Sequence, residues 1–336
     1  KSRWCGMGIS YLLLCKDMEG EIVRLWNKEL GRDFPLREEL FRQNSLEDEN
    51  VLIEGSWIAL EKDRLVGFVI SKMWKEDLEC LRNKKDIGYI QVILVDSEYR
   101  NRGIGSELLI RAEQSLKAKG AKTVVLGQDP WHYFSGVPSE YIDTVEWFKK
   151  KGYVEFGEQY DLYRQINREE KITLPALPEV EFKILSDVQK DSFLEFLSKC
   201  FPGRWEYEAL KYFEKGGTGR EFVIAEKKGK ITGFCRINDS KSPFIAQNVY
   251  WAPLFEEELG GIGPLGIDPH ERGKGYGLAI VQAGMYFLNR RGVRNIVIDW
   301  TNLVYFYGKL GFQVWKKYIE LKKTILDDKS NQNCSI

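Results

Sequence analysis

The sequence has few histidines and no organised cysteines, and these shortages exclude several kinds of site. Its two histidines, His132 and His270, are too few for a metal centre built on several imidazoles. Its six cysteines are scattered without a C-x-x-C pair, so the pattern favours neither a zinc site nor a disulfide framework. We therefore predict no bound metal and a reducing compartment, the cytoplasm.

The sequence also lacks net charge and any long apolar run. Its 50 basic residues balance 50 acidic residues, so no global field favours nucleic acid or an anionic membrane. The longest aliphatic run near the start, Leu12–Leu14, is far shorter than the roughly 20 residues that span a bilayer. We therefore expect neither nucleic acid nor a membrane as a partner.

What the sequence does have is the composition of an ordinary globular protein in a chain of double length. Of its 336 residues, 43% are hydrophobic and 30% are charged. The length is about twice a common domain size of roughly 150 residues. Two domains are the expectation that length alone supports.

Two segments of the sequence match each other. One reads I-L-V-D-S-E-Y-R-N-R-G-I-G-S over Ile93–Ser106, and the other reads L-G-I-D-P-H-E-R-G-K-G-Y-G-L over Leu265–Leu278. Aligned without gaps, Arg100 coincides with Arg272, Gly103 with Gly275, and Gly105 with Gly277.

Flanking features repeat in the same order. Upstream, V-G-F-V at 66–69 matches T-G-F-C at 232–235; downstream, W-F-K-K-K-G-Y at 147–153 matches F-Y-G-K-L-G-F at 306–312. A single long-range repeat indicates duplicated domains and not a solenoid, whose units recur every few dozen residues. We predict domains at 9–166 and 180–325, joined by a linker at 167–179 that contains Pro175 and Pro178.

Each copy has the periodicities of a mixed α/β domain. The strands we expect are 9–15, 57–60, 65–72, 87–95, 123–126 and a final stretch to 166 in the first copy, then 221–226, 230–238, 265–267 and 295–299 in the second. The helices we expect are 18–28, 106–119 and 141–151, then 187–199, 277–291 and 303–310.

The repeated Gly-rich segment follows a strand and precedes a helix, which makes it a candidate anion site. Glycine lets the backbone approach a ligand closely, and the free N–H groups of a first helical turn favour a phosphate. Arg100 or Arg272 would add a permanent positive charge. The segment is neither a nucleotide triphosphatase P-loop nor the dinucleotide fingerprint, because the spacing of its glycines differs from both.

Both segments resemble motif A of the GNAT acetyltransferase superfamily, Arg/Gln-x-x-Gly-x-Gly/Ala, and F-Y-G-K-L-G-F resembles its C-terminal motif. The resemblance covers nearly the whole chain as two copies, in a layout similar to that of tandem proteins of the mycothiol synthase type. It implies two GNAT folds, each a mostly antiparallel sheet flanked by helices with a splayed central strand, and it implies acetyl-CoA as the cofactor. The residues that it places around CoA are Leu265, Ile267, Arg272, Gly273, Lys274, Gly275, Tyr276 and Gly277, and Ile93, Val95, Arg100, Asn101, Arg102, Gly103, Ile104, Gly105 and Ser106.

In this family a tyrosine before the Gly-Phe of the C-terminal motif often protonates the departing thiolate. That position is Tyr307 in the second copy and Phe148 in the first, so the resemblance favours the second copy as the catalytic one. An aromatic residue on a helix is also commonly a core residue, which is the alternative for Tyr307. In the first copy, the aromatic segment 127–138 is either an acceptor wall that uses His132 or Asp129, or a packed loop.

The second copy offers Asp299 as a base, since it ends a predicted strand near the expected cleft. Such a carboxylate is also a common turn former or cap. Three adjacent acids, Glu256, Glu257 and Glu258, either attract a cationic acceptor or form a solvated surface. His270 lies beside the expected phosphate positions, where a base role does not fit.

The leading hypothesis is therefore an acetyl-CoA-dependent N-acyltransferase that acetylates a primary amine of a small molecule or peptide. The alternative is a CoA-binding scaffold or sensor in which one or both domains are inactive. The acceptor is not identifiable from the sequence. A monomer is expected because two fused copies supply the pairing that single-domain relatives obtain by dimerising, with a homodimer as the alternative.

Overall fold

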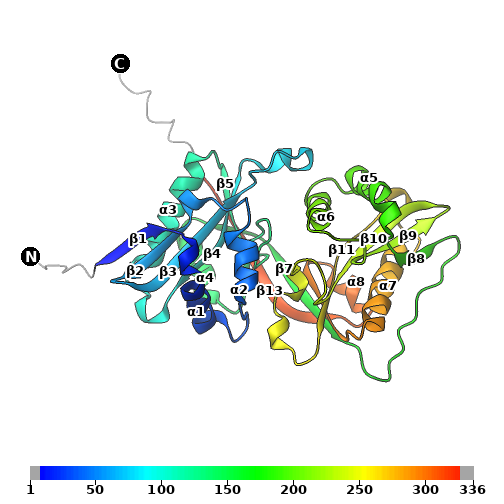
Figure 1. The fold of residues 1–336 in the computed structure, drawn as a ribbon. Coiled ribbons are helices and arrows are strands. Elements are labelled where there is room, and N and C mark those ends of the chain that lie inside the picture. The colour runs from blue at the N-terminus through cyan, green and yellow to red at the C-terminus, as the bar shows by residue number, and fades with distance from the viewer. Residues whose placement is uncertain (1–7, 326–336) are drawn as a thin grey trace, which may run out of the picture. The chain divides into compact units, whose positions relative to one another are not determined.

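The computed structural model describes residues 8–325, and its chain divides into two compact units. Unit 1 contains the residues up to Asp77, residues 83–158, and the residues from Tyr318 onward. Unit 2 contains residues 78–82 and 159–317. Each unit is a sheet covered by helices (Figure 1).

The sheet of unit 1 is antiparallel except at one pair of strands. Its strand order is β1 (Ile9–Leu13), β2 (Trp57–Glu61), β3 (Arg64–Met73), β4 (Ile87–Val95), β5 (Thr123–Leu126) and β13 (Gln313–Thr324). Only β4 and β5 run parallel within this order. The short strand β6 (Val137–Pro138) pairs with β13 as well.

The helices of unit 1 are α1 (Glu19–Leu30), α2 (Glu38–Phe41), α3 (Ile104–Ala118) and α4 (Ile142–Lys150). The apolar residues of α3 recur at helical spacing, and Leu108, Ala112 and Leu116 are fully buried in the main core of the unit. Phe148 of α4 joins the same core. Burial of this stripe, and not helix propensity, holds α3 on the sheet.

The sheet of unit 2 repeats this arrangement. Its order is β7 (Val154–Gln165), β12 (Asn295–Thr301), β11 (Leu259–Ile267), β10 (Lys230–Asn238), β9 (Phe222–Lys227) and β8 (Glu181–Ile184). Only β11 and β12 run parallel. The parallel pair therefore has the same place in both copies of the repeat.

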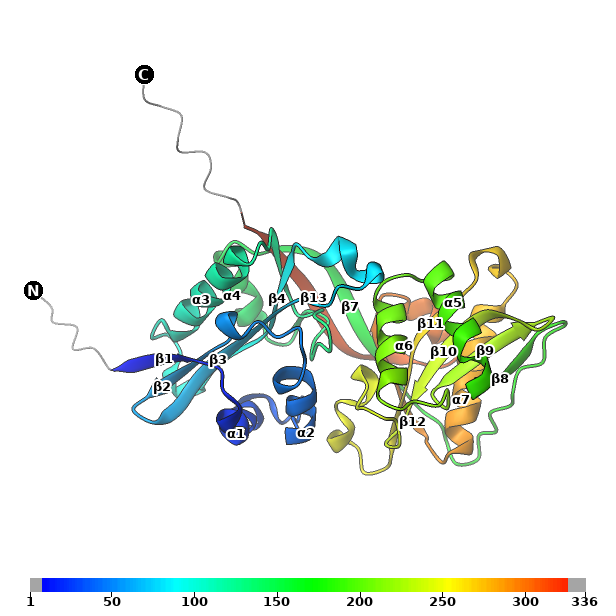
Figure 2. The same cartoon turned by 45° about the horizontal axis from the view of Figure 1, so that its top comes forward.

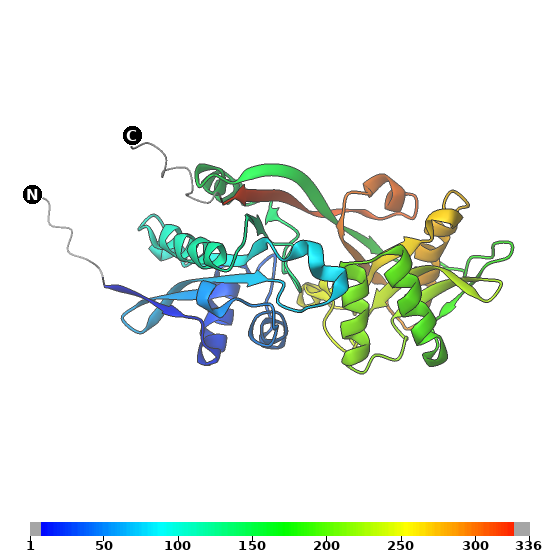
Figure 3. The same cartoon turned by 90° about the horizontal axis from the view of Figure 1, so that it is seen from above.

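Helices cover both faces of the sheet in unit 2. Along β10, Cys235 and Ile237 are buried with α7 (Tyr276–Arg290), whereas Phe234 contacts the ring of Phe193 on α5 (Lys190–Cys200). Alternate residues of a strand point to opposite faces, so α7 and α5 lie on opposite sides of the sheet. Figure 2 shows α6 (Arg204–Glu214) beside α5, and Figure 3 shows the two as a green pair. A short helix, α8 (Val304–Gly308), precedes β13.

The prediction of two mixed α/β copies with mostly antiparallel sheets is confirmed, but several elements differ from the expectation. Helices α2 and α6 and strands β6, β8 and β13 were not predicted, and the predicted start of β11, Leu265, is six residues late. The glycines of G-G-I-G at 260–263 hid the start of β11, because glycine is rare in strands. Burial against neighbouring strands overrides that local preference here.

Each unit is completed by a strand from the other copy of the repeat. Residues 160–165 of β7, in the first copy, pair with β12 of unit 2, and residues 322–324 of β13, in the second copy, pair with β5 of unit 1. The predicted boundaries at 166 and 180 thus describe the sequence repeat, whereas the compact units draw strands from both copies. Hydrophobic periodicity cannot reveal this exchange, because either partner would bury the same face of each strand.

Candidate active site

The turn after β11 in unit 2 presents open backbone to a ligand. The carboxylate of Asp268 accepts the backbone N–H of His270 at 2.9 Å and caps the short helix η9 (Pro269–Glu271). Gly273 and Gly275 then have φ angles of 79° and 81°, in the left-handed region that side chains rarely adopt. A Cβ built on either glycine would meet no atom within 4 Å. Gly275 is the N-cap of α7, whose first N–H groups have no partner within the helix.

The turn after β4 in unit 1 has the same local geometry. Asn101 and Gly103 have φ angles of 61° and 84°, and Gly103 is the N-cap of α3. Asparagine is among the few residues that tolerate this conformation, which explains why it stands where unit 2 has Gly273. The Nε–H of Arg100 donates to the carbonyl of Val95 at 3.1 Å, and Arg272 donates likewise to Ile267 at 3.2 Å.

Each parallel strand pair opens toward its turn. β11 pairs with β12 only over Leu259–Gly261, although β11 continues to Ile267. β4 pairs with β5 only over Ile87–Ile90 and continues to Val95. The later main-chain groups on that edge therefore have no partner in the neighbouring strand and are available to an extended amide-bearing chain. This geometry, with the open turn, fits the pantetheine arm and pyrophosphate of CoA.

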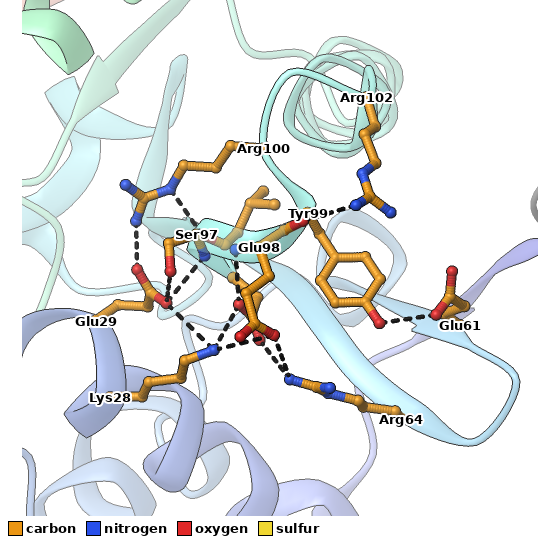
Figure 4. Close-up of polar contacts among 11 residues, drawn as sticks. Lys28, Glu29, Glu61, Arg64, Ser97, Glu98, Tyr99, Arg100 and Arg102 are labelled. Atoms are coloured by element: carbon orange, nitrogen blue, oxygen red, sulfur yellow. Dashed lines mark hydrogen bonds and ion pairs between the residues drawn. The ribbon is translucent and has the colours of Figure 1, made fainter.

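In unit 1 the arginine of the turn, Arg100, forms an ion pair with an acidic side chain (Figure 4). Glu29, near the end of α1, forms an ion pair with Arg100 at 2.6 Å and accepts the backbone N–H and the hydroxyl of Ser97 at 2.9 Å each. Beside it, Lys28 pairs with Asp96 at 2.7 Å. The turn of unit 1 is therefore held by charged groups from α1.

In unit 2 the corresponding corner has no such acid. Within residues 8–325, no carboxylate pairs with Arg272. Helix α5 ends near Arg272, at Cys200. Burial and the Asp268 carboxylate raise the pKa of the Cys200 thiol, whereas the charge of Arg272 lowers it. The two turns therefore share their backbone geometry and differ in local charge.

Tyr307 on α8 is buried in the core of unit 2, where its ring contacts Phe306 and Phe312. Its hydroxyl makes no hydrogen bond to another described residue. Burial, and then the nearby Cys235 and Asp299, raise the pKa of Tyr307 well above its ordinary value. The phenol therefore stays protonated at neutral pH. The equivalent Phe148 of unit 1 is buried between Trp147 and Tyr153 and carries no proton to donate.

Asp299 on β12 is only partly exposed. It lies beside Gly263, where β11 forms a bulge against β10. Its Oδ1 accepts a hydrogen bond from the side chain of Asn248 at 3.1 Å. Burial, and then the carboxylates of Asp161 and Glu208, raise the pKa of Asp299 to about 7. Both sequence-predicted catalytic residues thus lie in unit 2, close enough for the charge of Asp299 to act on Tyr307.

The position of unit 1 that corresponds to Asp299 is Gly127, since Thr123 and Asn295 begin the two equivalent strands. Gly127 has a φ of 67°, and a Cβ there would lie 2.2 Å from the carbonyl oxygen of Phe134. No side chain fits at this position. Unit 1 therefore lacks both the phenol and the carboxylate that unit 2 has.

The segment 127–138 of unit 1 is a packed loop. Asp129 is fully buried and pairs with Lys72 at 3.0 Å, and His132 is 3% exposed. The structure favours this interpretation over the acceptor wall, because neither side chain is presented to solvent. In unit 2, Glu257 pairs with Arg294 and Glu258 accepts from Ser240, so two of the three adjacent acids serve surface contacts. His270 is exposed on η9.

Three residues of the Asp299 environment were not found from the sequence: Asp161 on β7, Glu208 on α6, and Asn248 on the short helix η7 (Gln247–Val249). Asp161 was assigned to the first copy, and α6 was not predicted at all. Glu208 is 6% exposed and pairs with Arg204 at 2.9 Å. A carboxylate on the apolar face of an amphipathic helix was the one available signal for it.

Comparisons with known proteins agree with this geometry. The chain is 30% identical over 129 residues to a mycothiol acetyltransferase of Thermobispora bispora, which covers 34% of this chain and 37% of that protein. It is also 30% identical over 146 residues to an uncharacterized N-acetyltransferase of Methanocaldococcus jannaschii, covering 40% of this chain and 62% of that protein. The chain thus matches less than two thirds of the length of these curated relatives.

Solved structures show the same fold. The glucosamine N-acetyltransferase region of a fungal multi-domain GH3 β-N-acetylglucosaminidase is similar with a TM-score of 0.84 and 22% identity, covering 96% of this chain and 39% of that one. A tandem GNAT protein from the clavulanic acid biosynthesis pathway is similar with a TM-score of 0.68 and 14% identity, covering 96% of this chain and all of that one.

A family model matches the chain twice, at residues 20–134 and 190–312, and the two matches together cover more than half of the sequence. Each match contains one open Gly-rich turn and one strand pair that opens toward it. The chain belongs to the acetyltransferase (GNAT) family, as a tandem pair of GNAT domains.

Proposed function

We propose that unit 2 is an acetyl-CoA-dependent N-acyltransferase, which moves an acetyl group to a primary amine of a small molecule or peptide. One observation carries this proposal: unit 2 has Tyr307 and Asp299 at two positions where unit 1 has Phe148 and Gly127. Acetyl-CoA, when bound, supplies the acetyl thioester as the donor group.

Asp299 is the base. A catalytic base works best when its pKa lies near the working pH, and burial beside two other carboxylates brings Asp299 to about 7. Asp299 accepts the proton that the amine loses as the new C–N bond forms. The amine attacks in its neutral form, so this single proton and the one that the sulfur gains balance the transfer.

Tyr307 is the acid. Its raised pKa keeps the hydroxyl protonated at neutral pH, so that it donates a proton to the sulfur as the C–S bond breaks. Arg272 and the backbone N–H groups from Arg272 to Tyr276 would hold the pyrophosphate, and the unpaired edge of β11 near Leu265 would bind the pantetheine arm.

Unit 1 is proposed to bind CoA without turning it over. Its open turn has the backbone geometry of unit 2, whereas Gly127 leaves no room for a carboxylate and Phe148 has no hydroxyl. This proposal retains the scaffold alternative for one of the two domains.

The comparisons suggest the acceptors to test first. The structurally similar glucosamine N-acetyltransferase region bears the name of an amino sugar. We therefore propose glucosamine as the first acceptor, followed by cysteine and a peptide with a free N-terminus.

The test measures release of the CoA thiol from acetyl-CoA in the presence of each amine. We expect Tyr307→Phe to lower kcat about 100-fold, the usual scale of general acid catalysis. Tyr305→Phe is the matched control, because Tyr305 is 82% exposed on the same helix. Equal activity of wild type and Tyr307→Phe would overturn the assignment of the acid. Binding of acetyl-CoA without acetylation of any amine would favour the scaffold alternative.

A further inference from the structure

Asn248 lies across β11 and links the two strands on either side of it. Its Nδ2 donates to Oδ1 of Asp299 on β12 at 3.1 Å, and its Oδ1 accepts from Nδ2 of Asn238 on β10 at 3.1 Å. Asn238 is fully buried, and Asn248 is 3% exposed. Burying an amide is costly unless it is hydrogen-bonded. Here the Nδ2 group of each asparagine donates to the next residue, whereas Oδ1 of Asn238 has no partner among residues 8–325.

The glycines of β11 make room for this amide. A Cβ on Gly261 would lie 1.8 Å from Oδ1 of Asn248, closer than any real contact. Gly263, two residues later, faces both Asn248 and Asp299, and its φ of 129° disfavours any side chain. The G-G-I-G sequence that hid the start of β11 therefore provides the space in which Asn248 reaches Asp299.

The orientation of the Asn248 amide follows from its two partners. Nδ2 of Asn248 lies 3.1 Å from Oδ1 of Asp299 and 3.4 Å from the carbonyl oxygen of Gly263, and both of these atoms are acceptors, so the NH₂ end of Asn248 faces them. Reversing the amide would set its oxygen against a carboxylate and a carbonyl. Asp299 and Gly263 therefore fix Asn248 as a donor, and its Oδ1 is left to accept from Asn238.

Titratable groups from four other elements interact electrostatically with Asp299: Asp161 on β7, Glu208 on α6, Arg236 on β10 and the neutral phenol of Tyr307 on α8. Burial and the two carboxylates raise the pKa of Asp299, whereas a hydrogen bond from its own backbone and then the one from Asn248 lower it. Among the described residues, Asn248 is the side chain that hydrogen-bonds this carboxylate. Without that donor, the carboxylate would be protonated over more of the neutral range.

We propose that Asn248 is a positioning residue of the acetyl-transfer site, which holds Oδ1 of Asp299 so that the carboxylate faces the acceptor amine in its ionised form. Asn238 supports it from the neighbouring strand. This inference rests on the proposed function, because it assigns to Asp299 the role of base. It adds the residue that keeps that base oriented and charged.

The first test titrates Asp299 directly by carboxyl NMR in the full chain labelled with ¹³Cγ-aspartate, and the signal is assigned with Asp299→Asn. We expect Asn248→Ala to raise the pKa of Asp299 by about one unit, because a donor to the ionised form is lost. Gly261→Ala should shift it in the same direction, since its methyl group displaces the amide. Asn295→Ala is the matched control: Asn295 is buried on β12 and bonds Tyr163 at 2.7 Å, away from Asp299.

The second test is the pH profile of kcat/KM with acetyl-CoA and glucosamine, because this ratio reports the pKa values of the free enzyme. In Asn248→Ala the acidic limb of this profile should shift to higher pH by the same amount as the pKa measured by NMR. The KM for acetyl-CoA should be unchanged. An unchanged titration of Asp299 in both Asn248→Ala and Gly261→Ala would overturn the positioning role. Full activity of Asp299→Asn would instead overturn the base itself, and with it the proposed mechanism, so the two failures are distinguishable.

Discussion

At the residue scale, Asp299 is a group whose proposed function costs stability. A carboxyl with a native pKa of about 7 binds a proton between pH 4 and 7 that the unfolded chain, with an ordinary pKa near 4, has already lost. The free energy of unfolding therefore falls as the pH rises through that window, and the full penalty is present above pH 7. Activity is expected to require the ionised form, so the active pH range is also the range of lower stability.

This argument predicts the behaviour of Asp299→Asn. The variant keeps an acceptor for Asn248 and removes the charge, so it should be more stable than the wild type at pH 8 by about 4 kcal/mol. At pH 4 the two proteins should unfold at similar denaturant concentrations, since both then carry a neutral group. Chemical denaturation at both pH values measures this, and an equal difference at pH 4 and pH 8 would contradict it.

At the scale of elements, the two turns differ because different helix ends adjoin them. The end of α1 brings Glu29 to Arg100 at 2.6 Å, whereas α5 brings Cys200 to the corner of Arg272. Both turns use the same open backbone, but an acid beside a phosphate site weakens anion binding. We therefore propose that the helix end beside each turn, which lies outside the motif, changes the affinity of that turn for CoA.

We predict that Glu29→Gln raises the affinity of unit 1 for acetyl-CoA. The test uses Gly275→Trp as background, because a bulky side chain at this open, left-handed position should block the turn of unit 2 and leave unit 1 to bind. An increase of roughly threefold to tenfold is expected at low salt, falling as salt screens the charge. Native mass spectrometry and calorimetry report the stoichiometry and the affinity.

Two controls accompany this measurement. Glu21→Gln makes the same change of charge on α1, about two turns from Glu29, and should leave the affinity unchanged. Adding Gly103→Trp should abolish the remaining binding. If Glu21→Gln and Glu29→Gln act equally, the effect is one of overall charge and not of the contact with Arg100.

The elements missed from the sequence are those whose local pattern is ambiguous. β11 begins with glycines and was recognised only from Leu265. Helix α6 buries Tyr207 and Tyr212 on its apolar side together with a carboxylate, Glu208, which masks its periodicity. In both cases tertiary burial decides what the local sequence leaves open.

At the scale of the whole molecule, each unit depends on both copies of the repeat. The core of unit 1 includes Ile319 and Leu321 of β13, and the core of unit 2 includes Leu162 of β7, all of which are buried. A cut in the linker at 167–179 would remove these residues from the sheets that they complete. The loss of a single large core side chain costs about 2–5 kcal/mol, so losing a strand exceeds the stability of an ordinary domain.

We therefore predict that a fragment of residues 8–166 does not unfold cooperatively. A matched fragment, in which residues 8–158 are joined by a Gly/Ser linker to residues 318–325, restores the partner of β5 and should unfold cooperatively. Circular dichroism during thermal unfolding distinguishes the two. Cooperative unfolding of the first fragment would show that β7 can take the place of β13 beside β5.

The sequence by itself determined the family-level architecture: the repeat, the mixed α/β copies, the two Gly-rich turns, and the contrast of Tyr307 with Phe148. These features depend on local spacing, because a left-handed turn needs glycine or asparagine and an amphipathic helix needs its stripe. Only the tertiary structure decided which strand completes which sheet, which helix end adjoins each turn, and which side chains surround Asp299. Asp161, Glu208 and Asn248 come from three separate elements, and no local pattern encodes their meeting, since it is produced by burial of the elements that carry them.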